Sequence, residues 1–211
     1  MEILVVDRAM LFAEGYFQGF APADDIDYFQ TIQDNYFYKR RGDVEPDSAF
    51  KQPIAYAVIA NKETHHIFAY QRSVTDSYNE SRLRGKWSWG IGGHIDKIDS
   101  ANNDDPILAS LLREINEEID IVGFDEPRIL GYINDDQTKV GAVHFGILYL
   151  LETSEKTIKP KDAEMSWGGF MSYDQLEEIC ILNEKSVESW SEISLEPIRK
   201  ALGIGLETKE A

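Results

Sequence analysis

The stretch that begins at Asp104-Asp105-Pro106 constrains the fold more than any other part of the sequence. An aspartate followed by proline at the first helical position is a strong helix start, so we expect a helix from Pro106 to about Asp120. Successive residues turn by about 100°, which gathers apolar side chains on one face that must be buried. The chain must therefore build a core against this face. It is formed by Leu108, Leu111, Leu112, Ile115 and Ile119.

The opposite face of the same helix carries Glu114, Glu117 and Glu118. Spacings of three and four bring these carboxylates together, and like charges so close repel one another unless a cation lies among them. Mg²⁺ and Mn²⁺ prefer carboxylate oxygens, so a metal site is one interpretation. The other is a solvated acidic surface, which the three residues taken alone favour.

The rest of the chain alternates extended and helical patterns. Helices interspersed with strands of antiparallel character favour a mixed α/β sandwich over a doubly wound parallel sheet. Strands are expected at 54–60, 66–72, 87–91, 128–133 and 142–151, with a turn at 61–64. Helices are expected at 24–38, 173–182 and 186–202, a strand pair or extended arm at 1–20, and an exposed connection at 39–43.

A double glycine upstream changes how the helix carboxylates are interpreted. Gly92-Gly93 follows the aromatic segment 87–91, and the run REINEE lies downstream at 113–118. Together these segments resemble the Nudix box, which that family writes as Gly, five residues, Glu, seven residues, then Arg-Glu-apolar-any-Glu-Glu-any-Gly-apolar. The resemblance covers roughly residues 54–183. It implies a Nudix-like α/β/α sandwich with a mixed sheet.

The sequence departs from the family pattern in the loop before the helix. Gly93 and Arg113 are 20 positions apart where the family has 14, so the loop carries six extra residues. Counting back from Arg113 puts Asp105 at the position of the first Glu, which in the family pairs with the box Arg and braces the loop. The resemblance therefore implies an Asp105–Arg113 pair, with Asp104 as a substitute. Asp120 replaces the late Gly and weakens the usual turn after the helix.

The resemblance also implies metal-dependent chemistry. One or more Mg²⁺ or Mn²⁺ ions would neutralise phosphate oxygens and lower the pKa of a bound water that attacks phosphorus. Glu164, in a later loop, would supply the general base or a further ligand; the alternative is an exposed acid with no role. The implied residues are Glu114, Glu117, Glu118 and the backbone carbonyl of Gly92 for the metal, Glu117, Glu164 and Arg113 for catalysis, and Gly93 and Asp105 for structure.

Four residues are candidates for substrate contacts. Arg72 ends a predicted strand and could bind phosphate through paired hydrogen bonds, and Arg84 belongs to a basic cluster at 82–86. Trp87 could stack on a base, and His94 follows the double glycine. Each also has a structural interpretation, namely a surface arginine, a core aromatic or a loop histidine without a role.

Composition limits the partners and the compartment. The net charge of −17, from 38 acidic and 21 basic residues, opposes binding to a nucleic acid polymer. A small phosphorylated substrate remains acceptable because a bound metal inverts the local charge. The single cysteine, Cys180, excludes an internal disulfide, suits a reducing compartment and lacks an activating base. No signal-like or membrane-length segment is visible, so we expect a cytoplasmic protein without membrane contact.

Two further expectations concern organisation. Residues 1–50 are expected to form an extension packed on the core, 51–205 the Nudix-like domain, and 206–211 a C-terminal tail. The aromatic residues of the extension indicate either packing on the core or a homodimer contact. His144, inside an apolar strand, is expected to be a hydrogen-bonded core histidine.

The sequence thus predicts a metal-dependent hydrolase that cleaves a phosphoanhydride bond in a nucleoside-diphosphate-linked or related small molecule. One alternative is a Nudix-like sensor that binds a nucleotide without cleaving it. Such modules tend to lose box carboxylates, whereas this chain keeps Glu114, Glu117 and Glu118. The other is an isopentenyl-diphosphate-isomerase-like enzyme, which needs a cysteine across the pocket; Cys180 lies far downstream of the box.

Overall fold

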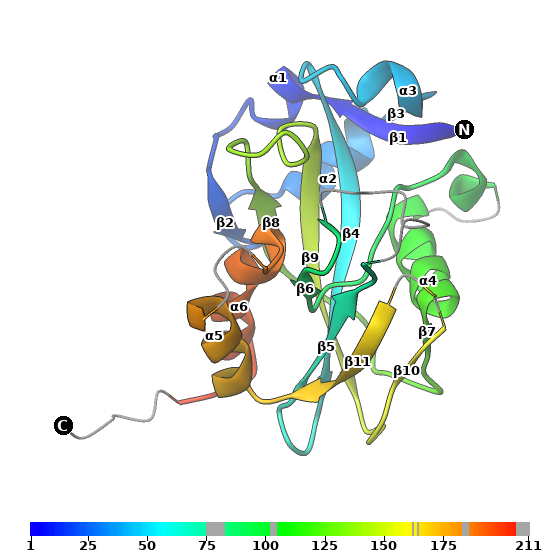
Figure 1. Cartoon of the computed structure of the whole chain (residues 1–211). Coiled ribbons are helices and arrows are strands. Elements are labelled where there is room, and N and C mark those ends of the chain that lie inside the picture. Colours follow the sequence, from blue (N-terminus) through cyan, green and yellow to red (C-terminus); the bar gives the residue numbers. More distant parts are fainter. Residues whose placement is uncertain (75–82, 102–104, 162, 164, 183–185, 206–211) are drawn as a thin grey trace.

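The computed structural model in Figure 1 describes residues 1–74, 83–101, 105–161, 163, 165–182 and 186–205. The strands in these residues are β1 (Glu2–Asp7), β2 (Gly19–Pro22), β3 (Phe37–Arg40), β4 (Phe50–Asn61), β5 (Ile67–Arg72), β6 (Trp87–Ser88), β7 (Ile119–Asp120), β8 (Arg128–Asn134), β9 (His144–Thr153), β10 (Lys159–Pro160) and β11 (Met165–Met171). The helices are α1 (Arg8–Leu11), α2 (Tyr28–Asn35), α3 (Arg41–Val44), α4 (Pro106–Glu118), α5 (Tyr173–Leu182) and α6 (Ser189–Ala201), with a short 3-10 helix, η2 (Lys97–Ser100).

The main sheet is mixed, as the sequence predicts. Its order is β11-β5-β4-β9-β8-β2, with β6 paired to β5 and β1 paired to both β3 and β4. The central strands β4 and β9 run parallel, in register from Gln52 opposite His144 to Asn61 opposite Thr153. The other strand pairs of this sheet are antiparallel. β4 is buried along almost its whole length because strands flank it and helices cover both of its faces.

Alternation along β4 divides the core into two layers. Ala55, Ala57 and Ile59 belong to the cluster that includes α4, whereas Tyr56 and Val58 belong to the cluster that includes α6. Successive side chains of a strand point to opposite faces, so one strand serves both layers. Figure 1 shows α4 on one side of the strands and α5 and α6 on the other. The arrangement is the expected α/β/α sandwich.

Helix α4 begins where its sequence signals predict. The side chain of Asp105 accepts hydrogen bonds from the backbone N–H groups of Ile107 (3.0 Å) and Leu108 (3.1 Å), and proline fills the first helical position. Leu112, expected on the buried face, is 42% exposed. The helix ends at Glu118 rather than Asp120, because residues 119–120 form β7 and pair with β10.

The first 50 residues differ most from expectation. Helix α2 starts after Asp27, which caps Gln30 N–H at 2.9 Å, instead of after Asp24-Asp25. The end of the predicted helix, 37–38, and the start of the expected connection, 39–40, form β3 instead, because they pair with β1. Part of the expected exposed connection is helical, since residues 41–44 form α3. Long-range pairing has overridden the local pattern here.

The segment before residue 50 nevertheless lies against the rest of the chain. Val6 pairs with Lys51 of β4, and Tyr28 and Ile32 of α2 share a buried cluster with Ile107 of α4. The division into an extension, a main domain and a tail stays a prediction. Among the described residues, no helix combines the length and apolarity that crossing a membrane would require.

Candidate active site around Arg113

Arg113 lies at the centre of the residues that the sequence singles out. Its Nε and Nη2 atoms donate to the two carboxylate oxygens of Asp99, at 2.9 and 3.0 Å. Nη1 donates to Glu114 (2.7 Å) and Glu117 (3.4 Å), and Nη2 also donates to the backbone carbonyl of His94 (3.1 Å). We call Asp99, Arg113, Glu114 and Glu117 the Arg113 cluster. The hydrogen bonds that Arg113 donates to Asp99, together with the negative charge of Glu114, raise the pKa of Arg113.

The expected pair between Asp105 and Arg113 is wrong. Asp105 is occupied in capping α4 and also accepts a hydrogen bond from Gln33 Nε2 at 3.2 Å. Asp99, on η2, is the partner of Arg113, and its side chain is only 4% exposed. Counting forward from Gly93, with five residues between, arrives at Asp99, so the six extra residues follow the first acid instead of preceding it. Asp104 lies outside the described residues.

The double glycine lets the loop approach both β4 and α4. A Cβ atom on Gly93 would lie 2.3 Å from a carboxylate oxygen of Glu114, and one on Gly92 would lie 2.2 Å from the carbonyl oxygen of Ala55. Any side chain at either position would displace a neighbour. The Glu114 carboxylate is therefore seated directly on the loop backbone.

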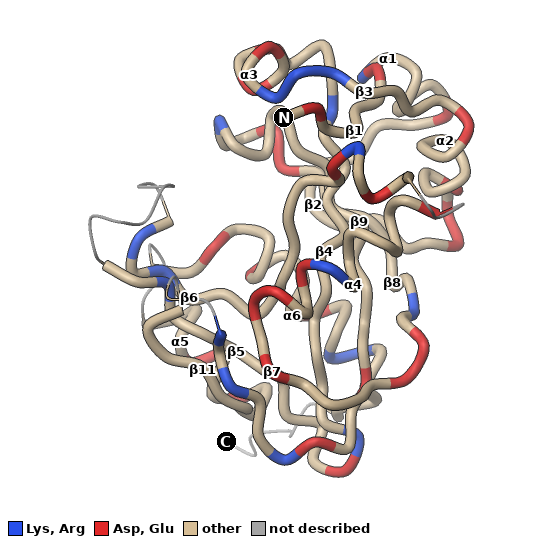
Figure 2. Tube along the Cα trace, turned by 90° about the vertical axis from the view of Figure 1, so that its right-hand side faces the viewer, with Lys and Arg blue, Asp and Glu red and all other residues tan. Residues whose placement is uncertain are grey.

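The three helix carboxylates have different surroundings. Glu114 is largely buried; burial raises its pKa, while Arg113 opposes the shift. The Glu117 side chain is 57% exposed. The backbone carbonyl of Glu118 accepts a hydrogen bond from the N–H of Lys161 at 2.8 Å, which fastens the later loop to the end of α4. Figure 2 shows the acidic positions of α4 gathered toward this end of the helix, beside one basic position.

These residues fit a hard divalent cation in donor type. Within the described residues, no three histidine, cysteine, aspartate or glutamate side chains converge closely enough to hold a metal ion. The Arg113 cluster nevertheless sets three carboxylates against one guanidinium, and Gly93 provides the space in which the Glu114 carboxylate meets backbone. Carboxylate and carbonyl oxygens are the ligands that Mg²⁺ and Mn²⁺ prefer.

Arg72 lies in a separate ion pair. Its Nε donates to Glu188, the residue before α6, and Glu188 also accepts a hydrogen bond from Ser88 Oγ at 3.1 Å. The Arg72 guanidinium lies 5.4 Å from the ring centre of Tyr70. Sequence reasoning missed Glu188, which is 116 positions from Arg72 and belongs to no motif. A phosphate-binding role for Arg72 stays a prediction.

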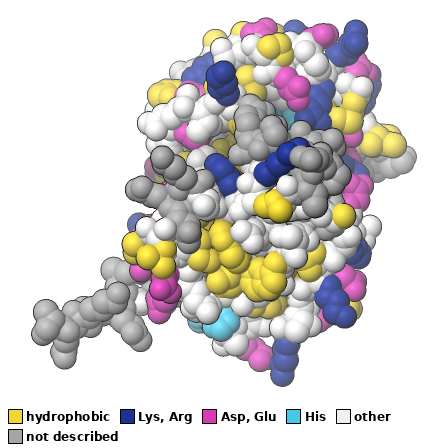
Figure 3. All heavy atoms as spheres, in the orientation of Figure 1, with side chains coloured by type: hydrophobic (Ala, Val, Ile, Leu, Met, Phe, Trp, Pro, Cys, Tyr) yellow, Lys and Arg dark blue, Asp and Glu magenta, His cyan; other side chains and the backbone are white. Residues whose placement is uncertain are grey.

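The aromatic candidate Trp87 packs against a second tryptophan. Its ring meets that of Trp167 edge to face at 5.4 Å, and Trp167 is 45% exposed on β11. Figure 3 shows hydrophobic side chains gathered on the face where β5 and β11 lie. Arg84 is half-buried in the turn that precedes β6. The structure thus gives Trp87 a packing contact and leaves its predicted stacking on a base untested.

The His94 ring contacts the sheet. Its Nε2 lies 2.8 Å from Gln52 Oε1 and 3.1 Å from His144 Nε2, and burial lowers its pKa to about 3. His144 Nδ1 donates to the Val140 carbonyl at 2.7 Å, so His144 is the hydrogen-bonded core histidine that the sequence predicts. Sequence reasoning missed Gln52 and the pairing of the two histidines.

Glu164 lies outside the described residues, and so does Arg82, the first residue of the basic cluster at 82–86. Burial raises the pKa of Cys180 to about 11, which agrees with the expectation of an unreactive thiol.

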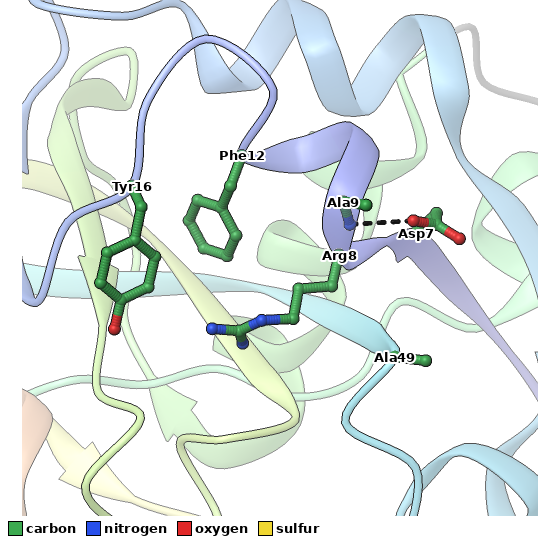
Figure 4. Close-up of a pocket in the computed structure, with 6 residues that line it drawn as sticks. All are labelled: Asp7, Arg8, Ala9, Phe12, Tyr16 and Ala49. Carbon is green, nitrogen blue, oxygen red and sulfur yellow. Dashed lines mark hydrogen bonds between the residues drawn. The ribbon is translucent and has the colours of Figure 1, made fainter.

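A cavity of about 500 Å³ lies in the N-terminal segment, away from all predicted site residues. Figure 4 shows the Arg8 guanidinium extending toward the rings of Phe12 and Tyr16. The cavity is lined by Asp7, Arg8, Ala9, Phe12, Tyr16 and Ala49.

Beside this cavity, Asp136 accepts hydrogen bonds from Arg8, from Lys51 Nζ (2.8 Å) and from Tyr16 Oη (2.9 Å). We call these four residues the Asp136 cluster. The Lys51 side chain is fully buried, and its Nζ also donates to the carbonyls of Gly141 (2.7 Å) and His144 (3.1 Å). The cluster joins α1, β4 and the loop after β8, and no sequence motif indicated it.

Comparison with known proteins gives a consistent result. Residues 50–190 match the model of the NUDIX domain. Protein YmaB of Bacillus subtilis (strain 168) is 37% identical over 198 residues, which cover 90% of this chain and 93% of that protein.

Two solved structures are also similar. The crystal structure of Tm1382, provisionally named a Nudix hydrolase, is 29% identical with a TM-score of 0.77, covering 95% of this chain and 100% of that one. The NUDIX domain of Shewanella oneidensis NrtR, solved with ADP ribose, is 16% identical with a TM-score of 0.55, covering 72% of this chain and 88% of that one. The second likeness concerns the fold alone.

Proposed function

The chain belongs to the Nudix family and is a Nudix-type pyrophosphohydrolase, and on this premise we propose that it uses Mg²⁺ or Mn²⁺ to cleave a nucleoside-diphosphate-linked or related small molecule. The observation that carries the proposal is the Arg113 cluster: a buried acid and two helix carboxylates meet on one guanidinium, beside a glycine at which a Cβ atom would displace the Glu114 carboxylate. Excess negative charge at such a site favours a bound cation.

Each residue has a distinct task in this proposal. Glu114, Glu117, Glu118 and the Gly92 carbonyl would hold the metal, which when bound lowers the pKa of a water and neutralises phosphate oxygens. Arg113 is a positioning residue: its bidentate pair with Asp99 fixes the loop, and its Nη1 aligns two carboxylates. Glu164 is proposed as the general base or a further ligand.

The substrate class rests on the site and on one relative. The NrtR domain was solved with ADP ribose, a nucleoside diphosphate joined to a sugar, so compounds of this class are the first to test. We assign phosphate contacts to Arg72 and Arg84 and base or sugar contacts to Trp87. A homodimer and a cytoplasmic location remain expectations.

The test is hydrolysis of a substrate panel with Mg²⁺ or Mn²⁺, including ADP ribose and an allylic diphosphate. We expect Glu117→Gln to lower kcat/KM by about 10²-fold or more, because metal positioning and charge neutralisation are both damaged. Glu192→Gln, an exposed acid of α6, is the matched control and should not change the rate. Full activity in excess chelator would contradict the proposal.

Two other outcomes would identify the alternatives. Tight nucleotide binding without turnover of any compound would indicate a sensor. Isomerisation of the allylic diphosphate without phosphate release would indicate the isomerase-like enzyme. Partial burial raises the pKa of the Cys180 thiol to about 11, which argues against the isomerase because that chemistry needs a reactive cysteine in the pocket.

A further inference from the structure

His94 is held on two sides by different parts of the molecule. Its ring contacts Gln52 of β4 and His144 of β9, residues that face each other across the parallel centre of the sheet. Its backbone carbonyl accepts hydrogen bonds from Arg113 Nη2 (3.1 Å) and Ser110 Oγ (3.4 Å) of α4. His94 therefore joins the sheet to helix α4.

The hydrogen bonds of this group define where its protons lie. His144 Nδ1 donates to a carbonyl, so its Nε2 is an acceptor. Gln52 Nε2 lies 3.4 Å from the Val44 carbonyl, which leaves Oε1 to face His94 as a second acceptor. The proton between the three side chains must then be on His94 Nε2.

The residues directly before His94 have little rigidity of their own. Two glycines in succession leave the backbone freer than any other pair. On their other side, Ile91 exchanges two backbone hydrogen bonds with Ala57 of β4, at 2.8 and 2.9 Å. Gly92-Gly93 thus spans two fixed points on the same strand, the Ile91–Ala57 bridge and the His94 ring.

We propose that Gln52, His94 and His144 are positioning residues that fix the Gly92-Gly93 backbone for metal binding. The inference rests on the proposed function, in which the Gly92 carbonyl is a metal ligand. His94 would then act through its main chain rather than by touching substrate. Partners that orient metal ligands from behind typically account for about 10- to 100-fold in metal affinity.

The test measures Mn²⁺ binding to the full chain from the electron paramagnetic resonance signal of free Mn²⁺. Gln52→Leu and His144→Phe each remove one acceptor of the His94 proton, and we expect each to weaken Mn²⁺ binding by about 10-fold or more. His144→Gln keeps an acceptor and should restore most of the affinity. At saturating Mn²⁺, the kcat of Gln52→Leu and of His144→Phe should return close to the wild-type value.

Tyr56→Phe is the matched control. It removes a buried hydrogen bond of the same strand, between Tyr56 Oη and Ser191 Oγ at 2.8 Å, on the α6 side. We expect Tyr56→Phe to lower thermal stability and to leave Mn²⁺ affinity unchanged. If Gln52, His94 and His144 had a purely structural role, Tyr56→Phe would instead weaken Mn²⁺ binding as much as the two anchor variants, Gln52→Leu and His144→Phe.

Several results would overturn the proposal. Wild-type Mn²⁺ affinity in either folded anchor variant would do so, as would equal weakening by Tyr56→Phe. Failure of both anchor variants to fold would identify the group as structural. An unaltered chain that binds no Mn²⁺ would instead contradict the proposed function itself.

Discussion

Arg113 and Asp136 each lie at the centre of a charged cluster, but with the signs reversed. In the Arg113 cluster one cation meets three acids, Asp99, Glu114 and Glu117. In the Asp136 cluster one acid meets two cations, Arg8 and the fully buried Lys51, together with a tyrosine hydroxyl.

The difference in charge indicates a cation-binding site at the Arg113 cluster and a structural role for the Asp136 cluster. The Arg113 cluster keeps surplus negative charge at a surface, which a divalent cation can neutralise. The Asp136 cluster satisfies its carboxylate with several donors and holds α1, β4 and the loop after β8 together. Buried ion pairs carry a large desolvation cost, so removing one partner costs more than the pair contributes.

The largest expected effect comes from Asp136→Asn. The change leaves Lys51 buried without its carboxylate, and we expect the free energy of unfolding to fall by about 3–5 kcal/mol. Urea unfolding measures it. The kcat/KM of the folded variant should stay near the wild-type value, because none of the proposed active-site residues is touched. Loss of catalysis with full stability would reverse the roles assigned to the two clusters.

Metal binding should distinguish the clusters next. Mn²⁺ at about 100 times its dissociation constant should stabilise the wild-type chain by about 2.7 kcal/mol. The double variant Glu114→Gln, Glu117→Gln should lose this gain, whereas Asp136→Asn should keep it. Thermal unfolding with and without Mn²⁺ is the measurement. Equal stabilisation of the double variant would place the metal elsewhere.

Asp99 and Asp105, the two acids compared as partners of Arg113, give a third and smaller contrast. Asp99→Asn removes the bidentate partner of Arg113, and we expect kcat/KM to fall by about 10- to 100-fold. Asp105→Ala removes a helix cap and should cost about 1 kcal/mol of stability with little change in kcat/KM. Steady-state kinetics and urea unfolding of both variants test this. The reverse pattern would restore Asp105 as the brace of the loop.

This contrast also shows where sequence reasoning was sufficient. Helix α4, its Asp105-Pro106 start and the mixed sheet could be predicted, because caps, proline and hydrophobic period are local signals. The predicted partner of Arg113 was wrong because the loop carries an insertion. Counting back from Arg113 reaches Asp105, whereas counting forward from Gly93 reaches Asp99. Asp99 and Asp105 are both acids in the loop, and only the fold selects between them.

Contacts across long stretches of sequence could not be predicted at all. Lys51 and Asp136 are 85 positions apart, and Gln52 meets His94 from 42 positions away. Neither pair belongs to a motif. The β1–β3 pairing likewise turned the end of a predicted helix into a strand, because hydrogen bonds between distant segments outweighed the apolar period of the segment itself.

The smallest expected effect is a pH dependence confined to the Asp136 cluster. Burial acts to raise the pKa of Asp136, but the hydrogen bonds from Arg8, Lys51 and Tyr16 outweigh it and hold the pKa below the ordinary value of 3.8. A depressed carboxyl pKa adds stability above the unfolded value and loses it as the pH falls through the folded value. The stability difference between wild type and Asp136→Asn should therefore be constant near neutral pH and shrink below about pH 4.

Urea unfolding of both chains from pH 7 to about pH 3 measures the difference, with Asp25→Asn as an exposed control. A difference that stayed constant over this range would mean that Asp136 titrates normally and that its cluster is no tighter than a surface ion pair.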